Sequence, residues 1–143
     1  MIGLKINQAK GLFFDRAAVM SAADRAERRV LSRFGAFVRR GARSSIRRRK
    51  SVSRPGSPPS SHTGLLKRNI FFIYEPSRSN VVIGPILLNK ATDAPVLLEH
   101  GGSVTRRRRG KRVRVTYRPR PFMGPAFERE KPKLPQMWRD SVR

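Results

Sequence analysis

Positive charge is concentrated in two short parts of this chain, and this limits how the chain can fold. Residues 16–54 hold twelve Arg and one Lys against two acidic residues, and residues 105–120 hold eight Arg and one Lys with none. These segments carry most of a formal net charge of +24. Self-repulsion opposes a compact monomer, and hydrophobic residues form only 38% of the chain, so the core must be modest. We therefore expect an anionic partner or help from neighbouring subunits.

Helical periodicity dominates the first third of the chain. Asp15 is a suitable N-cap, and apolar or small residues then recur every three or four positions until about Arg49. This predicts one helix of roughly 45–50 Å that Gly35 and Gly41 could kink. The predicted apolar stripe comprises Val19, Ala23, Ala26, Val30, Phe34, Phe37, Gly41 and Ser45, and the neighbouring basic face comprises Arg25, Arg29, Arg40, Arg43 and Arg47.

Loops and strand-like segments make up much of the remaining chain. Residues 2–6 alternate weakly and predict a short strand. Residues 51–64 contain three Pro, two Gly and six Ser or Thr, which predicts an extended loop. Residues 70–75 and 80–88 are rich in β-forming residues and are separated by a short turn, which predicts a hairpin. Pro85 is expected to end its regular pairing.

A second, arginine-rich hairpin is predicted over residues 103–118. Within residues 112–117, Arg or Thr alternates with Val or Tyr, and this period of two is typical of a strand. The basic side chains of this strand are therefore expected on one face. Gly110 and Lys111 are expected to join the two strands, with Gly110 available for a positive φ. The glycine pair 101–102 would let the hairpin swing as an arm.

These elements predict an α+β fold in a single domain. A long N-terminal helix is expected to pack on a small antiparallel sheet built from two hairpins, followed by short C-terminal helices near residues 125–130 and 136–141. The domain spans residues 1–143, with an N-terminal strand and long basic helix (1–50), a Pro/Ser-rich loop (51–64), and the sheet with its Arg-rich hairpin and C-terminal tail (65–143).

The chain offers little for catalysis or metal binding. It has no Cys, and neither His62 nor His100 has a partner at ligand spacing. The nine acidic residues are scattered, and neither a P-loop nor a nucleophile elbow is present. We expect no enzymatic activity, no catalytic residues, no metal and no cofactor, with a small hydrolase only a formal alternative. No apolar run reaches the ~18 residues of a membrane span, so no membrane contact is expected.

The basic segments instead indicate contact with phosphates or carboxylates, which the planar fork of Arg suits. One alternative is a non-specific nucleic-acid-binding protein of nucleoid or ribosomal type, held by phosphate contacts. The hairpin has too few aromatic residues for a base-stacking platform. Another alternative is a solvated face that pairs with acids of neighbouring subunits. The predicted contact residues are Arg40, Arg43, Arg47, Arg106, Arg107, Arg108, Arg109, Lys111, Arg112 and Arg114.

Four short motifs, taken in order, resemble a known family. They are SSHTGLLKRNIFF (60–72), NVVIGPILL (80–88), PVLLEHGG (95–102) and RPRPFMGPAFEREKP (118–132). The ordered set resembles the neck and tail-completion family encoded in head–tail morphogenesis operons of long-tailed bacteriophages. Relatives there include proteins similar to the lambda-type minor tail protein Z. The resemblance covers about residues 15–140, and LEHGG followed by RPFMGPAF is its most specific part.

The resemblance implies a structural virion protein with no catalytic residues. It implies a long helix packed across an antiparallel sheet, in protomers that form a homo-oligomeric six- or twelvefold ring below the portal. The partners would be adjacent portal or adaptor proteins and tail-terminator or tail-tube proteins, with packaged DNA in the lumen. The protein would belong to the virion neck and to the host cytoplasm during assembly. The heavy arginine content and the Pro/Ser-rich loop depart from the family pattern.

Three apolar residues of the last motif are candidates for anchoring one subunit to the next. Phe122, Met123 and Phe127 lie on a segment that prolines hold extended. Their side chains can pack on a neighbouring subunit, or they can pack within the core of their own chain. For Phe122 the second alternative is favoured.

Overall fold

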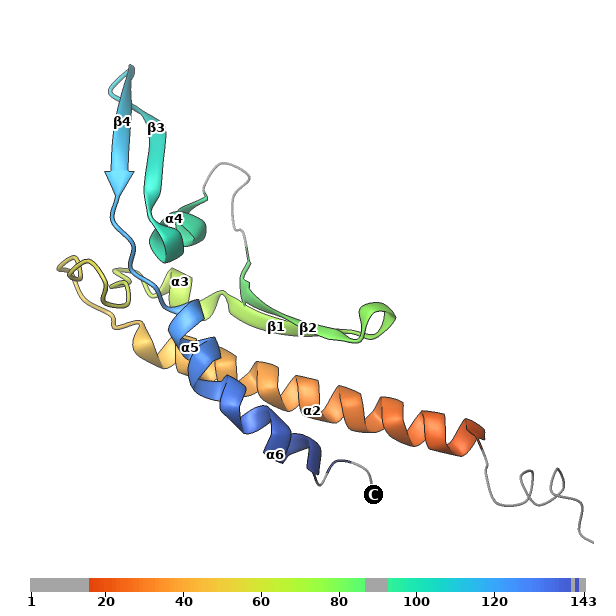
Figure 1. Cartoon of the computed structure of the whole chain (residues 1–143). Coiled ribbons are helices and arrows are strands. Elements are labelled where there is room, and N and C mark those ends of the chain that lie inside the picture. Colours follow the sequence, from red (N-terminus) through yellow and green to blue (C-terminus); the bar gives the residue numbers. More distant parts are fainter. Residues whose placement is uncertain (1–15, 87–92, 140, 142–143) are drawn as a thin grey trace, which may run out of the picture.

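The computed structural model describes residues 16–86, 93–139 and 141 (Figure 1). The expected α+β class is confirmed, with a long N-terminal helix, two antiparallel hairpins and short C-terminal helices. The strand expected over residues 2–6 and the N-cap expected at Asp15 lie outside the described residues. The elements are α2 (Arg16–Ser45), α3 (Leu65–Arg68), β1 (Ile70–Glu75), β2 (Asn80–Pro85), α4 (Ala94–His100), β3 (Gly102–Arg108), β4 (Lys111–Tyr117), α5 (Met123–Glu130) and α6 (Leu134–Arg139), with 3-10 turns at Pro76–Arg78 and Lys131–Lys133.

Helix α2 buries a stripe that advances by four residues at each step. Its buried hydrophobic residues are Ala26, Val30, Phe34, Val38 and Ala42, and Ile46 continues the stripe just after the helix. The expected step from Phe34 to Phe37 is wrong, because Phe37 is only half-buried. The guanidinium groups of Arg33 and Arg40 lie over its ring, at 5.7 and 5.6 Å from the centroid. Steps of four drift slowly around a helix, so the buried face can follow hairpin and C-terminal helices in turn.

Helix α2 ends at Ser45, four residues earlier than expected. The hydroxyls of Ser44 and Ser45 donate hydrogen bonds to the carbonyl oxygens of Gly41 and Ala42, at 2.9 and 2.8 Å. Local side-chain bonds of this kind compete with regular helical pairing. The chain after the helix is therefore free to turn toward the Pro/Ser-rich loop.

Strands β1 and β2 form a hairpin whose inner face lies on α2 (Figure 1). The register pairs Ile70 with Pro85, which confirms Pro85 as the last paired residue. Ile70 is fully buried, whereas the outer face of the hairpin is open to solvent. Its exposed hydrophobic residues are Phe71, Ile73 and Val82, at 42, 66 and 55%.

Strands β3 and β4 form a second hairpin that projects away from α2 (Figure 1). The two hairpins are separate two-stranded sheets and are not hydrogen-bonded into one. The expectation of a shared sheet is therefore corrected in this respect. Helix α4 lies between the hairpins in the chain and carries the second one out of the plane of the first (Figure 1).

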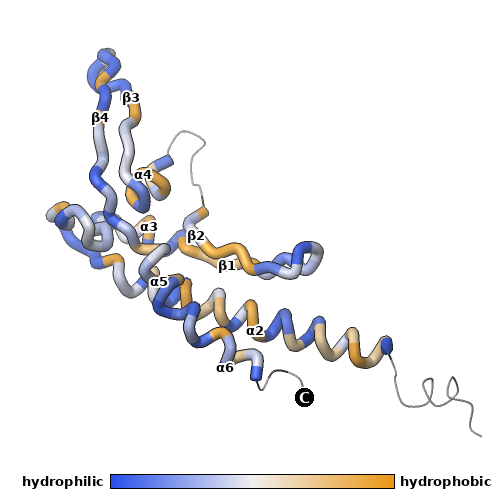
Figure 2. The backbone as a smooth tube through the Cα atoms, viewed as in Figure 1, coloured by the Kyte–Doolittle hydropathy of each residue, from blue (hydrophilic) through white to orange (hydrophobic). Residues whose placement is uncertain are grey.

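Helices α5 and α6 run back along α2 and close the core from the other side (Figure 1). Phe122 and Ala126 pack with residues of α2 and β1 in one buried cluster. Figure 2 shows apolar residues along β1 and β2 and hydrophilic residues toward the free end of the second hairpin. The apolar interior is therefore confined to the region where α2, the first hairpin and α5 meet.

Candidate functional site

The basic hairpin projects as an arm, which we define as residues 102–117 and call the basic arm. Three of its residues, Val104, Val115 and Tyr117, are partly buried, and the rest are exposed. The arm thus presents six Arg and Lys111 to solvent, all of them predicted contact residues. Figure 1 shows its turn lying far from α2.

The two faces of the basic arm differ in character. Residues paired across an antiparallel ladder share a face, so Val104, Val115 and Val113 lie together with Arg106. The guanidinium of Arg106 lies over the ring of Tyr117, 5.4 Å from its centroid. The opposite face is wholly polar, and it confirms the prediction that Arg112 and Arg114 share a face. The polar face comprises Ser103, Thr105, Arg107, Arg112, Arg114 and Thr116.

Like charges lie directly opposite each other near the end of the basic arm. Arg107 pairs with Arg112, and Arg108 pairs with Lys111. Such cross-strand pairs repel and destabilise an isolated hairpin. An anion bound between or beside them would relieve this repulsion, because each positive group would gain an opposite charge.

The turn of the arm is Arg109-Gly110, one residue earlier than the Gly110-Lys111 turn that we expected. Both residues have positive φ, 50° and 79°. Two consecutive positive φ values are typical of the two-residue turns that match strand twist. Glycine adopts this conformation freely, whereas Arg109 does so at some cost. The turn therefore places a fifth arginine of the arm at its outermost point.

Backbone hydrogen bonds hold the base of the basic arm. The Arg120 N–H donates to the Leu98 carbonyl oxygen at 2.6 Å, and the Gly56 N–H donates to the Pro119 carbonyl oxygen at 2.9 Å. Gly101 has a φ of 75°, and a Cβ there would lie 3.0 Å from the ring of Pro119. The base is thus tied to α4 and to the Pro/Ser-rich loop, which opposes the free swing expected from the glycine pair.

Glu99 is a functional residue that the sequence reasoning missed. Its carboxylate accepts hydrogen bonds from the backbone N–H groups of Phe122, Met123 and Gly124, at 2.9, 3.0 and 2.7 Å. These groups begin α5 and would otherwise have no intrahelical partner. The N-cap residue of α5 is Phe122, which has no side chain able to cap. That missing local cap was the one available signal that a distant carboxylate serves instead.

The predicted helix arginines are not gathered with those of the basic arm. Arg40 is exposed over Phe37, Arg43 is half-buried, and Arg47 is exposed just beyond α2. The ion pairs found in the described parts of the chain join Glu75, Glu128 and Glu130 to nearby cations and involve none of the predicted contact residues.

The three candidate anchoring residues have different positions. Phe122 is 1% exposed and belongs to the core of its own chain, so intramolecular packing is the correct alternative for it. Met123 is partly buried against the same core. Phe127 remains 39% exposed, although its ring meets that of Phe34 edge-on with centroids 5.5 Å apart. Phe127 is therefore the one of the three most available to a neighbour.

Residues 16–86, 93–139 and 141 contain no group of three or more His, Cys, Asp or Glu able to hold a metal ion. Within the same residues, no helix combines the length and apolar character that a bilayer crossing requires.

The sequence matches no family model, and comparisons with curated proteins and with solved structures likewise give no match. The resemblance to phage neck proteins therefore stays a prediction from the motifs.

Proposed function

We propose that this chain is a structural subunit of the neck of a tailed bacteriophage, a ring-forming part of the head-to-tail connection without catalysis. The observation that carries the proposal is the basic arm. It exposes seven cations, opposes like charges at two positions, and has no ion pair to the described acids. Such a surface is complete only against external carboxylates or phosphates. In a neck, adjacent rings and threaded DNA would supply both.

Exposed apolar surface supports an assembled state. Phe71, Ile73 and Val82 leave the outer face of the first hairpin open, and Phe127 adds apolar area on α5. Contiguous apolar surface of this kind is typical of protein interfaces. We propose that a neighbouring copy covers it through the head-to-tail contacts that close a ring.

The contacts of Glu99 supply a physical reason for the order of the two most specific motifs. LEHGG contributes the carboxylate, and RPFMGPAF contributes the three N–H groups that it binds. The two motifs therefore act as one structural unit at the base of the basic arm. This supports treating them together in the resemblance.

Native mass spectrometry and negative-stain imaging of the purified chain test the proposal. We expect closed rings of six or twelve copies, and the protein should be detected in purified virions. Substitution of Arg106–Arg109 by Ser should impair joining of heads to tails while the far-ultraviolet circular dichroism spectrum stays unchanged. A chain that stays monomeric and is absent from virions would contradict the neck assignment.

A nucleic-acid-binding protein is the second candidate, and the shape of the basic arm favours it. A two-stranded β-ribbon fits the major groove of B-DNA, and the arm is such a ribbon with cations on both faces. This function predicts a monomer or dimer that binds DNA with a steep salt dependence. Ring formation with weak DNA binding would exclude it.

A further inference from the structure

A pocket separate from the basic arm lies between the end of α2 and the Pro/Ser-rich loop. Its volume is about 690 Å³, which has room for a small anion and the group that carries it. The lining residues are Ser44, Ser45, Arg47, Arg49, Val52, Ser53, Arg54, Ser57, Pro58, Pro59 and Ser60.

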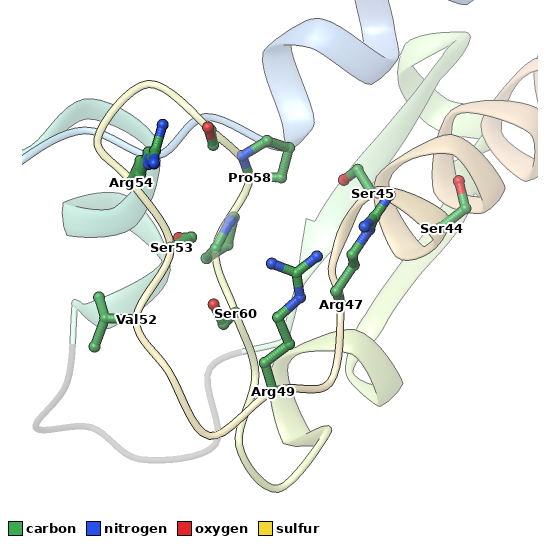
Figure 3. Close-up of a pocket in the computed structure, with 11 residues that line it drawn as sticks. Ser44, Ser45, Arg47, Arg49, Val52, Ser53, Arg54, Pro58 and Ser60 are labelled. Carbon is green, nitrogen blue, oxygen red and sulfur yellow. The ribbon is translucent and has the colours of Figure 1, made fainter.

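The lining has a strongly cationic character. It includes the guanidinium groups of Arg47, Arg49 and Arg54 and no carboxylate. None of the three side chains takes part in an ion pair among the described residues. Figure 3 shows Arg47 and Arg49 on one side of the pocket, with Ser53 and Ser60 on the loop opposite. Three unpaired cations around one cavity repel each other, and an anion between them would reverse the sign of that interaction.

A hydroxyl on the wall of the pocket also lacks a partner. The Ser53 Oγ is buried and makes no hydrogen bond. A buried hydroxyl without a partner costs about 1–3 kcal/mol. Only a few polar atoms are left in this state in a native fold, and those that are often mark a ligand position.

The pocket is held in shape by contacts on both sides. The Ser61 N–H donates to the Arg47 carbonyl oxygen at 3.0 Å, beside a parallel bridge between Arg47 and Ser60. On the other side, the Arg120 Nε donates to the Ser53 carbonyl oxygen at 3.0 Å. The Pro59 side chain is fully buried between these walls. The loop is therefore fixed to the end of α2 and to the base of the basic arm, which preorganises the pocket.

We propose that this pocket binds a phosphate oxyanion, with the guanidinium groups of Arg47 and Arg49 as its main ligands and Arg54 and the loop hydroxyls beside them. Arginine presents paired donors that match two phosphate oxygens, and such charge-assisted hydrogen bonds are about twice as strong as neutral ones. The phosphate can be free in solution or part of a nucleic-acid backbone. The inference does not depend on the neck assignment.

Adjacent residues supply a charge-matched control for the test. The variant Arg47→Gln with Arg49→Gln removes two cations from the pocket lining. The control Arg48→Gln with Lys50→Gln removes two cations from the same stretch, but these residues line a neighbouring cavity and not this pocket. Both variants keep a long polar side chain and lower the net charge equally, so they differ mainly in which cavity they alter.

Isothermal titration of the full chain with inorganic phosphate is the first measurement. We expect saturable binding to the wild-type chain, at least about tenfold weaker binding to the Arg47/Arg49 variant, and little change in the control. Equal weakening in both variants would overturn the proposal, since overall charge would then explain the binding. Absence of saturable binding to the wild-type chain would overturn it as well.

Titration with a short double-stranded DNA then identifies the source of the phosphate. If a nucleic-acid backbone enters the pocket, the Arg47/Arg49 variant should lower the log–log salt slope by about 1–2 relative to the control, and inorganic phosphate should compete. If DNA binding is the same in both variants while phosphate binding is lost in only one, the ligand is a free phosphate. Ring formation by the same variants reports separately on the neck proposal.

Discussion

At the scale of single residues, Glu99 connects two segments that are far apart in the chain. One carboxylate holds the first three N–H groups of the segment that begins α5, and it lies directly before the glycine that starts the basic arm. Its negative charge also lies at the positive end of the α5 dipole. Glu99 therefore fixes α5, α4 and the base of the arm relative to one another.

We expect Glu99→Ala to lower the free energy of unfolding by about 1–3 kcal/mol, because three backbone N–H groups lose their acceptor. Glu99→Gln should cost less, since an amide oxygen can still accept. Glu128→Ala is a matched control: its exposed carboxylate makes only a 3.9 Å pair with Lys131, so the change should stay within about 0.5 kcal/mol. Urea denaturation measures all three, and equal losses for Glu99→Ala and Glu128→Ala would contradict the capping role.

Tyr74 makes a titratable contact between the first hairpin and α2. Its hydroxyl donates to Glu27 Oε1 at 2.9 Å, and this bond, with the nearby negative charge, raises the pKa of Tyr74 above its usual 10.0. Since the pKa is higher in the folded chain, the resulting stability is complete below about pH 10 and is lost as pH rises through the folded pKa. Tyr74→Phe should reduce that loss in urea titrations at high pH.

The pKa of Tyr74 can be measured directly in a Tyr117→Phe background, where tyrosinate absorbance reports on Tyr74 alone. Adding Glu27→Gln should move the titration to lower pH, because the charged acceptor is gone. Identical titrations with and without Glu27 would show that the hydrogen bond does not form in solution.

At the scale of elements, two glycines of α2 set how closely its neighbours approach. The helix is continuous through Gly35 and Gly41, so neither breaks it. A Cβ on Gly35 would lie 2.8 Å from Phe72 Cδ2 and 2.9 Å from Val81 Cγ2. A Cβ on Gly41 would lie 3.5 Å from Ala126 Cβ, an ordinary contact. The first hairpin therefore needs a glycine beneath it, and α5 does not.

The same substitution at these two positions should have opposite effects. Gly35→Ala should destabilise the fold by about 1–3 kcal/mol, because the hairpin must move. Gly41→Ala should leave stability unchanged or raise it by up to about 1 kcal/mol, through the higher helix propensity of alanine. Thermal unfolding of the pair tests this. Destabilisation by Gly41→Ala as large as that by Gly35→Ala would show that the packing on α2 differs from that described.

At the scale of the whole molecule, positive charge is balanced by few internal contacts. The described ion pairs all join residues three positions apart, and the contact cations of α2 and the basic arm have none. We expect the urea midpoint to rise as salt increases from about 0.01 to about 0.1 M, since the screening length falls from about 30 to about 10 Å. The variant with Arg106–Arg109 replaced by Ser should show a smaller rise. A midpoint that falls with salt would contradict net self-repulsion.

Local periodicity made much of the fold predictable. The long helix, the first hairpin with its end at Pro85, and the basic hairpin follow from side-chain spacing, since a period of two or of nearly four is a property of neighbouring residues. The small errors at Phe37 and at the Arg109-Gly110 turn are shifts of one residue. Such shifts depend on which neighbour covers the element, and local sequence does not contain that information.

The sequence by itself determined which segments are helical or extended and which carry the charge, because both are set within a few residues. The tertiary structure alone decided that the two hairpins stay separate, that Glu99 caps a helix some twenty residues later, and that Arg47, Arg49 and Ser53 line one pocket. Each of these results brings together groups with no regular spacing along the chain. Their proximity comes from how the packed core places the loop, α4 and the basic arm, and periodicity carries no record of that placement.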